Sequence, residues 1–463
     1  MTAPETAAER LARIVPDAVV EVLGDLHASG HAGYVVGGSL RDALLGRDPS
    51  DWDLATDALP DQLVKLFHGA VYENRFGTVA IRRDDDVFEA TTFRTEHDYA
   101  DFRRPHRVEF GTDVIADLAR RDFTVNAIAW GREAAGDGPN DLVDPFDGIG
   151  DLGRRLLRAV GDPGARFRED ALRMVRALRL AAALEFEIEP ETLAAIGANA
   201  GLVAHLSGER IGAELEKLLA APRPSIGLRL AQETGLLAVI APDLAAQVGI
   251  AQNKVPGDDL WVHTLRTVDA APANRPVVRL AALVHDIGKP ATLTDGHFPH
   301  HDVVGARLAE AWLRRLRFPH AAADDVAHLV RHHMFWADPA LSDAAVRRFL
   351  KRVGARHLDN LFALRRADDI GSGMSPDDDA QIAFRRRLDA ELAAEAALDR
   401  YALVIDGDDL MRELRLEPGP RLGRMLDALV DRVVEDPALN ERATLLLLAQ
   451  GMLADVDEAP GAR

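Results

Sequence analysis

The chain has 463 residues, enough for about two to four domains, and 47% of them are hydrophobic. No apolar run approaches the roughly 18 residues that a membrane span needs, and the polar segment from Met1 to Arg13 lacks the apolar core of a secretory signal. The absence of cysteine excludes disulfides and thiolate metal sites and fits a cytoplasmic protein, while the net charge of −20 argues against nucleic-acid binding unless basic residues cluster locally.

The first informative segment is a short apolar run that leads into a glycine turn. Tyr34-Val35-Val36 predicts a buried strand, Gly37-Gly38-Ser39 a tight turn, and the residues from Leu40 onward a helix. Backbone N–H groups at such a turn can hold a phosphate group. We therefore expect a phosphate-binding turn at residues 37–39.

Two carboxylates follow this turn. Asp51 and Asp53 are spaced i and i+2, which places both on one face of an extended strand. Transfer of a phosphoryl group with two metal ions requires carboxylates that hold two Mg²⁺ ions. Glu89, in the predicted strand 87–91, is our candidate for the third ligand. The alternatives are that the two aspartates are turn residues and that Glu89 is a solvated strand residue.

The chain divides by periodicity. Residues 31 to about 130 mix short apolar runs with turns, whereas from about 164 onward the apolar residues recur with helical period. Pro222-Arg223-Pro224 is a candidate boundary, and Gly371–Asp379 predicts a polar linker. We expect an α+β protein with an α/β head over 1–150, a helical neck over 151–222, a helical body over 223–370 and a helical tail over 371–463.

Five segments resemble, in the same order, the motifs of bacterial class II tRNA nucleotidyltransferases, the CCA-adding enzymes, whose heads are of the polymerase-β type. These segments are Gly37–Asp42 with Asp51–Asp53, Asp117–Ala127, Asp144–Gly148, Glu169–Arg173 and Glu209–Leu215. The resemblance implies addition of C and A to the 3′ end of tRNA from CTP and ATP, with two Mg²⁺ ions at Asp51, Asp53 and Glu89 and release of pyrophosphate. Bacterial poly(A) polymerases share most of these motifs.

Base choice is assigned to Asp170 and Arg173, which we expect at i and i+3 on one helix. A carboxylate only accepts hydrogen bonds and a guanidinium only donates them. The pair therefore matches the amine donor and the ring-nitrogen acceptor that cytosine and adenine share, and it opposes uracil and guanine. An ordinary surface ion pair is the alternative.

The resemblance also suggests roles for other residues. Arg121, with Arg120, is expected to face the triphosphate, Asn126 to contact the ribose, and Asp122 to orient an arginine; surface or helix-cap functions are the alternatives. The predicted nucleotide-binding set is completed by Gly37, Gly38, Ser39, Arg41 and Arg176. Residues 95–109 are expected to form a mobile loop, with Phe102 where the family has glycine.

A local excess of positive charge identifies a possible RNA partner. Residues 151–180 contain eight arginines against four acidic residues, and such charge gives salt-sensitive affinity for phosphates. We expect this segment to bind the acceptor stem and TΨC arm of tRNA by shape. A solvated basic helix face is the alternative.

A second candidate site lies further along the chain. Its six residues follow the order of the metal-binding set of HD-type phosphohydrolases, and they are His263, His285, Asp286, His301, His333 and Asp368. Imidazole and carboxylate groups bind divalent transition metals, and Mg²⁺ is the alternative ion. His300 and His332 are adjacent alternatives for two positions, and Lys289 is a candidate phosphate contact.

The sequence leaves the product open within the family. The chain could add all of CCA, only CC, only A, or polymerise A. A second hypothesis makes hydrolysis at the HD site the main activity, with a head that only binds RNA. The intact pairs Asp51/Asp53 and Asp170/Arg173 argue against that second hypothesis.

Overall fold

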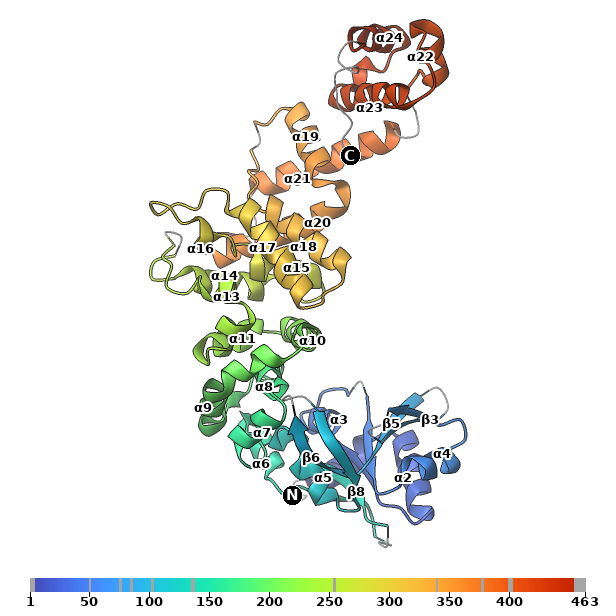
Figure 1. Ribbon diagram of the computed structural model, residues 1–463, viewed down its shortest axis with the longest axis vertical. Coiled ribbons are helices and arrows are strands. Elements are labelled where there is room, and N and C mark those ends of the chain that lie inside the picture. Colours follow the sequence, from blue (N-terminus) through green and yellow to red (C-terminus); the bar gives the residue numbers. More distant parts are fainter. Residues whose placement is uncertain are drawn as a thin grey trace.

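The structure is a computed structural model of the whole chain. It describes residues 5–49, 51–74, 77–83, 86–100, 104–134, 138–252, 255–338, 340–375, 379–398 and 403–453. The molecule is elongated and curved, with the sheet-containing head at one end and the last three labelled helices at the other (Figure 1). No described helix has the length and apolarity that crossing a membrane requires.

A seven-stranded mixed sheet forms the head, in the order β3-β4-β5-β2-β1-β8-β9. In chain order the strands are β1 (Gly33–Val36), β2 (Asp53–Thr56), β3 (Val71–Asn74), β4 (Thr78–Arg83), β5 (Asp86–Thr92), β8 (Ala129–Arg132) and β9 (Asp141–Val143). Alternate side chains fill two cores, with Val35 and Leu54 on one face and Tyr34 and Ala55 on the other. The predicted α/β head is confirmed.

The segment expected to be a loop over 95–109 is extended backbone instead. β6 (Arg94–Ala100) and β7 (Arg104–Phe110) pair antiparallel as a separate two-stranded sheet. The loop prediction is wrong for the described backbone because pairing between two polar segments supplies hydrogen bonds that polar composition does not reveal. Phe102 lies outside the described residues.

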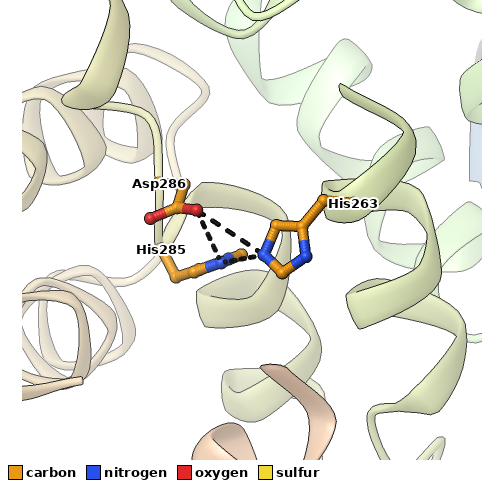
Figure 2. A group of neighbouring side chains, drawn as sticks. All are labelled: His263, His285 and Asp286. Carbon is orange, nitrogen blue, oxygen red and sulfur yellow. Dashed lines mark hydrogen bonds and ion pairs between the residues drawn. The ribbon is translucent and has the colours of Figure 1, made fainter. Parts of the chain in front are cut away.

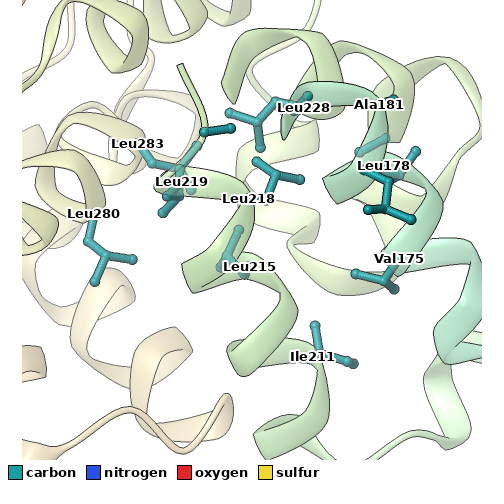
Figure 3. Close-up of a cluster of buried hydrophobic side chains, with 14 of the residues drawn as sticks. Val175, Leu178, Ala181, Ile211, Leu215, Leu218, Leu219, Leu228, Leu280 and Leu283 are labelled. Atoms are coloured by element: carbon teal, nitrogen blue, oxygen red, sulfur yellow. The ribbon is translucent and has the colours of Figure 1, made fainter. Parts of the chain in front are cut away.

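Helices follow the head, as predicted. After α6 (Gly148–Arg154) come α7 (Pro163–Glu169), α8 (Leu172–Leu184), α9 (Pro190–Asn199), α10 (Gly208–Leu219) and α11 (Pro224–Glu233). Side chains of α8, α10, α11 and α15 (Pro276–Val284) form one apolar cluster, in which α10 lies between α8 and the side chains of Leu280 and Leu283 of α15 (Figure 3). The hydrophobic core therefore continues across Pro222 without a break.

The helices that follow include α14 (Leu260–Ala270), α16 (Lys289–Thr292), α17 (His301–Arg315), α18 (His320–His332), α19 (Asp343–Val353), α20 (Leu358–Gly371) and α21 (Asp379–Leu398). Of these, α14, α18 and α20 pack directly against α15. Phe384 and Leu388 of α21 belong to the same core as α15. In contrast, α22 (Gly407–Leu414), α23 (Pro420–Glu435) and α24 (Arg442–Gly451) share a separate core that includes Leu410, Met425 and Leu445.

α10 is held against these helices at both of its ends. A Cβ at Gly208 would lie 2.0 Å from the carbonyl oxygen of Arg315, at the end of α17, so only glycine permits this approach. At the other end, the buried Arg279 of α15 donates hydrogen bonds to the carbonyls of Leu219 and Ala221. These contacts satisfy carbonyls that the end of a helix leaves without partners, and they fix the position of α10.

Candidate active site

A polar cavity of about 580 Å³ lies where the head meets α8 and α10. Its lining includes most of the nucleotide-site residues that the sequence predicted. From the head it takes Gly37, Gly38, Ser39, Arg41, Asp42, Pro49, Asp51, Asp53, Arg120, Arg121, Asp122 and Asn126, and from the two helices Arg173, Arg176, Arg179, Glu214 and Lys217. Glu89 and Asp170 are not part of this lining.

Three carboxylates lie on, or just before, two neighbouring strands in the middle of the sheet. Asp53 begins β2, Asp51 precedes it by two residues, and Glu89 lies directly opposite Asp53 on the parallel strand β5. Opposite residues on paired strands point to the same face, and Glu89 alternates with the buried Phe88 and Ala90. Oxygen ligands of this kind suit Mg²⁺. The arrangement fits a site for hard divalent cations.

Neighbouring charges act on the carboxyl group of Asp53 in opposite directions. Desolvation raises the pKa of the Asp53 carboxyl, the guanidinium of Arg121 opposes that rise, and the neighbouring Asp51 adds to it. A cation bound between Asp51 and Asp53 would favour the charged form of both carboxylates.

The glycine turn lies against these carboxylates. Gly37 has a φ of 82° and precedes α3 (Gly38–Leu44). A Cβ at this position would lie 3.2 Å from Nη1 of Arg121 and 3.3 Å from Oδ2 of Asp53. Glycine therefore serves two needs here, the left-handed backbone and the narrow space between a cation and an anion.

Arg41 and Ser39 brace the turn. The Arg41 guanidinium donates to both carboxylate oxygens of Asp42, at 2.9 and 2.8 Å, and to Oδ1 of Asn126 at 2.7 Å. The Ser39 hydroxyl donates to the carbonyl of Val36 at 3.3 Å. Both side chains line the cavity with their positions already fixed.

Asp117 orients the two arginines that follow α5 (Val114–Ala119). Its buried carboxylate accepts from Nε of Arg120 at 2.8 Å and from Nη2 of Arg121 at 3.3 Å. Burial alone would raise the pKa of Asp117, but the two guanidinium groups lower it below its usual value. Asp117 belongs to a motif quoted from the sequence, where we gave it no role.

Asp122 joins the head to α8. Its carboxylate accepts from the backbone N–H of Phe123 at 2.9 Å, from Nδ2 of Asn126 at 3.0 Å and from Nη1 of Arg176 at 2.9 Å. Burial would raise the pKa of this carboxyl, but Arg176 and the other donors lower it to about 2. Asp122 is therefore a charged hydrogen-bond centre in the cavity wall.

Asp170 and Arg173 do not lie on one helix, so that prediction is wrong. Asp170 follows α7 in an extended conformation, and its side chain accepts from the backbone N–H of Leu172, where α8 begins. The first N–H groups of a helix have no partner within it, which favours an aspartate just outside it. The other oxygen of Asp170 accepts from Nη2 of Arg210 at 2.8 Å.

Arg173 has partners of its own. It is buried, and it donates to Oε2 of Glu169 and to the carbonyl of Arg120, each at 2.8 Å. The contact with Arg120 places the guanidinium against the arginine pair of the head. Both residues of the predicted base-reading pair are thus held by other side chains.

α10 contributes Glu214 and Lys217 to the cavity lining, and the sequence had suggested no role for either residue. Glu214 accepts from Nε of Arg179 at 2.6 Å and lies 3.6 Å from Nε of Arg176. Arg179 was visible in the arginine-rich segment, and Arg210 and Glu214 were visible in the last motif. Lys217, one turn after Glu214, carried no signal in the sequence.

The second candidate site is a buried cluster of imidazole and carboxylate groups. Two overlapping groups that share Asp286 have ligand atoms close enough for a metal ion, one with His263 and His285 and the other with His301 and His333. Nε2 of His263 lies 3.1 Å from Nε2 of His285 and 3.1 Å from Oδ1 of Asp368. Figure 2 shows His263 and His285 converging beside Asp286. The structure brings all six predicted residues together.

Backbone carbonyls fix three of the imidazole rings. Nδ1 of His285, His301 and His333 donates to the carbonyl three residues earlier, at 2.8, 2.8 and 2.7 Å. This contact leaves Nε2 as the ligand atom, the usual arrangement of a metal-binding histidine. The buried Nε2 atoms of His301 and His333 have no hydrogen-bond partner in the described part of the chain, which fits a metal ligand.

The structure separates these histidines from their neighbours in sequence. His300 is exposed, with a φ of 55°, whereas His301 begins α17 and is buried. The ring of His332 lies tilted beside that of His328, one turn earlier on α18, and the pKa of His332 is lowered to about 4, mainly by burial.

Lys289 completes the cluster. Its Nζ lies 2.6 Å from Oδ2 of Asp286, and both side chains are buried. Burial would raise the pKa of Asp286, but His285 and Lys289 lower it well below its usual value. This ion pair occupies Lys289, which the sequence suggested as a phosphate contact.

Three family models match the chain. The Poly A polymerase head domain matches residues 33–158, the probable RNA and SrmB-binding site of polymerase A matches 185–248, and the HD domain matches 237–398. The matched head, with its mixed sheet, defines an enzyme of the nucleotidyltransferase class.

Similar proteins identify the family within the nucleotidyltransferase class. The CCA-adding enzyme of Geobacillus kaustophilus (strain HTA426) is 34% identical over 91% of this chain and 93% of that protein. The CCA-adding enzyme of Streptococcus thermophilus (strain CNRZ 1066) is 32% identical over 93% and 96%. The crystal structure of the Bacillus stearothermophilus CCA-adding enzyme in complex with CTP has a TM-score of 0.68 and 29% identity, covering 96% of this chain and 100% of that one. The chain belongs to the family of CCA-adding enzymes.

Proposed function

We propose that this protein adds C and A to the 3′ end of tRNA, completing CCA from CTP and ATP without a template. The observation that carries the proposal is that the glycine turn, Asp51, Asp53 and the arginines of α8 line one and the same cavity. The similar enzymes named above support this substrate assignment, and one of them has been crystallised with CTP. Because tRNA is the proposed substrate, we propose the cytoplasm as the compartment.

The proposed reaction is an attack by the 3′-hydroxyl of tRNA on the α-phosphate of the nucleotide, with pyrophosphate leaving. Asp51, Asp53 and Glu89 would hold Mg²⁺ ions, which supply charge neutralisation and activate the hydroxyl. The N–H groups of the glycine turn and the guanidinium of Arg121 would orient the triphosphate. Asn126, held by Asp122 and Arg41, would face the ribose.

We assign base choice to Asp170 and Arg173, as the sequence suggested. Arg210 and Glu169 hold these two side chains in place. A carboxylate has about four acceptor sites and a guanidinium five donors, so both retain capacity for a base. Selectivity for C and A would then arise from fixed hydrogen-bonding groups of the protein.

The decisive experiment measures product length. Three tRNAs, ending at the discriminator base, at C and at CC, are incubated with CTP, with ATP, and with both. We expect all three to end in CCA when both nucleotides are present. Products that stop at CC, that gain only the last A, or that carry long A tracts would contradict the proposal and identify another member of the family.

We further propose that the buried His/Asp cluster binds a divalent metal ion. The converging Nε2 atoms and the carboxylates of Asp286 and Asp368 suit a transition metal, with Mg²⁺ less favoured by the imidazole ligands. A phosphohydrolase whose head only binds RNA is the weaker alternative, because the head retains its complete carboxylate set.

The four segments proposed from the sequence would then divide the work. The head (1–150) carries transfer, the neck (151–222) reads the base and contacts RNA, the body (223–370) holds the second metal, and the tail (371–463) contacts tRNA. The continuous core between neck and body supports a fixed relation between these two segments.

A further inference from the structure

One end of the cavity is defined by the parallel course of α8 and α10. Arg210, near the start of α10, contacts Asp170, and Glu214 contacts Arg176 and Arg179 further along both helices. Lys217 follows one turn later, roughly 10 Å from Arg210 along the helix axis. Lys217 therefore lies at the end of the cavity that is far from the proposed base-reading residues.

Residues of the head border the same end of the cavity on the side opposite α10. Nη1 of Arg47 donates to the carbonyl of Ala183, in the last turn of α8, at 3.0 Å. The chain then passes through Pro49, which lines the cavity, to Asp51. A strand of RNA that enters between Pro49 and Lys217 thus reaches the metal-binding carboxylates first.

Lys217 differs from the other cationic side chains of the cavity in its ion pairing. Each arginine of the lining forms an ion pair with a carboxylate; the pairs are Arg41–Asp42, Arg120–Asp117, Arg121–Asp117, Arg173–Glu169, Arg176–Asp122 and Arg179–Glu214. Lys217 is exposed and has no ion-pair partner within the described ranges of the chain. Its full charge is available to a ligand.

We propose that Lys217 contacts a backbone phosphate of the tRNA 3′ strand as this strand enters the cavity. The proposal rests on the proposed function and adds the place and direction of entry. A lysine suits this role because its ammonium is a mobile point charge, which follows a phosphate through successive additions without demanding one geometry. The triphosphate of the incoming nucleotide, at the glycine turn and Arg121, does not need it.

Lysine acetylation tests the contact directly. The chain has only five lysines, so mass spectrometry can follow each one in the intact protein. We expect tRNA to slow acetylation of Lys217 several-fold, and CTP with Mg²⁺ to leave it unchanged. Lys65, exposed on α4 (Pro60–Leu66), and Lys351, paired with Asp431, are internal references. Protection by CTP alone, or none by tRNA, would overturn the proposal.

Kinetics supply the second test. Lys217→Ala should raise KM for tRNA about 5- to 10-fold and leave KM for CTP unchanged, and the salt dependence of tRNA binding should lose about one phosphate contact. Lys217→Arg should restore most of the affinity, and Lys65→Ala is the matched control. An unchanged KM for tRNA in Lys217→Ala refutes the contact. Absence of nucleotide addition by the unmodified protein would instead refute the proposed function.

Discussion

The two candidate metal sites of this chain are built in opposite ways. In the head, Asp51, Asp53 and Glu89 are exposed, and two of them line an open cavity. In the body, the side chains of His263, His285, His301, His333, Asp286 and Asp368 are all buried. The first site opens into a cavity that could admit a substrate, whereas the second presents only buried ligand atoms.

Because of this difference, we expect the open site to affect catalysis and the buried site to affect stability. An exposed carboxylate such as that of Asp51 contributes little to folding, because water still solvates it in the folded protein. A carboxylate buried among imidazoles and an ammonium contributes strongly, because each charge depends on the others. Substitutions at the two sites should therefore affect different measurements.

The largest effect is expected at the open site. Asp51→Ala should lower CTP incorporation on the order of 10³-fold or more, because several kcal/mol of transition-state stabilisation by the metal is lost. Affinity for tRNA and the thermal midpoint should change little. Asp48→Ala, an exposed neighbour outside the cavity lining, is the control. Normal incorporation by Asp51→Ala would remove the catalytic assignment.

A substitution in the buried site should instead lower stability and leave nucleotide incorporation nearly unchanged. Asp286→Ala leaves Lys289 buried without its carboxylate partner and removes the ligand that the two candidate groups share. We expect a loss of about 3 kcal/mol or more in the free energy of unfolding. Bound metal, measured by elemental analysis, should also be lost, while CTP incorporation per folded molecule stays within twofold.

His300→Ala is the matched control for that variant, since His300 is exposed beside the buried His301. It should retain both metal and stability. If Asp286→Ala lost both bound metal and CTP incorporation, the two sites would be coupled, and the buried site would not serve stability alone.

The smallest expected effect concerns a buried carboxylate of the head and its contribution to the free energy of unfolding. Asp122 is a buried carboxylate beside the open cavity, with a pKa of about 2 in the folded protein. The unfolded value is about 3.9, so its stabilisation, about 2–3 kcal/mol, is present above about pH 4 and is lost as the pH falls through 2. Asp122→Asn should therefore unfold at lower urea than the unchanged protein at pH 7.

The difference in the free energy of unfolding between Asp122→Asn and the unchanged protein should fall, near pH 3, to about half of its value at pH 7. Asp61→Asn, on the exposed surface of α4, is the control and should show no difference at either pH. A gap that stays constant with pH would mean that the stability of the head does not depend on the charge of Asp122.

Local patterns predicted much of the fold and of both sites. The apolar run before Gly37 became β1, and the strand predicted over 87–91 became part of β5, where Glu89 lies opposite Asp53. The order of histidines and aspartates located the buried cluster. The choice between His300 and His301 depended on where α17 begins, which the sequence did not specify.

The partners of long polar side chains could not be predicted in the same way. Arg173 reaches Arg120, which is 53 residues away in sequence, and Asp170 reaches Arg210, 40 residues away. A helical spacing of three residues cannot anticipate such contacts, because they depend on how α7, α8 and α10 pack. The contribution of α10 to the cavity was missed for the same reason.

The separate core of α22–α24 has a consequence for how the protein is made. Its buried side chains contact one another and are not part of the core that joins the head to α21. Segments with their own cores fold as units in the order in which they are synthesised. The last part of the chain can therefore acquire its structure after the nucleotidyltransferase head is already complete, without delaying it.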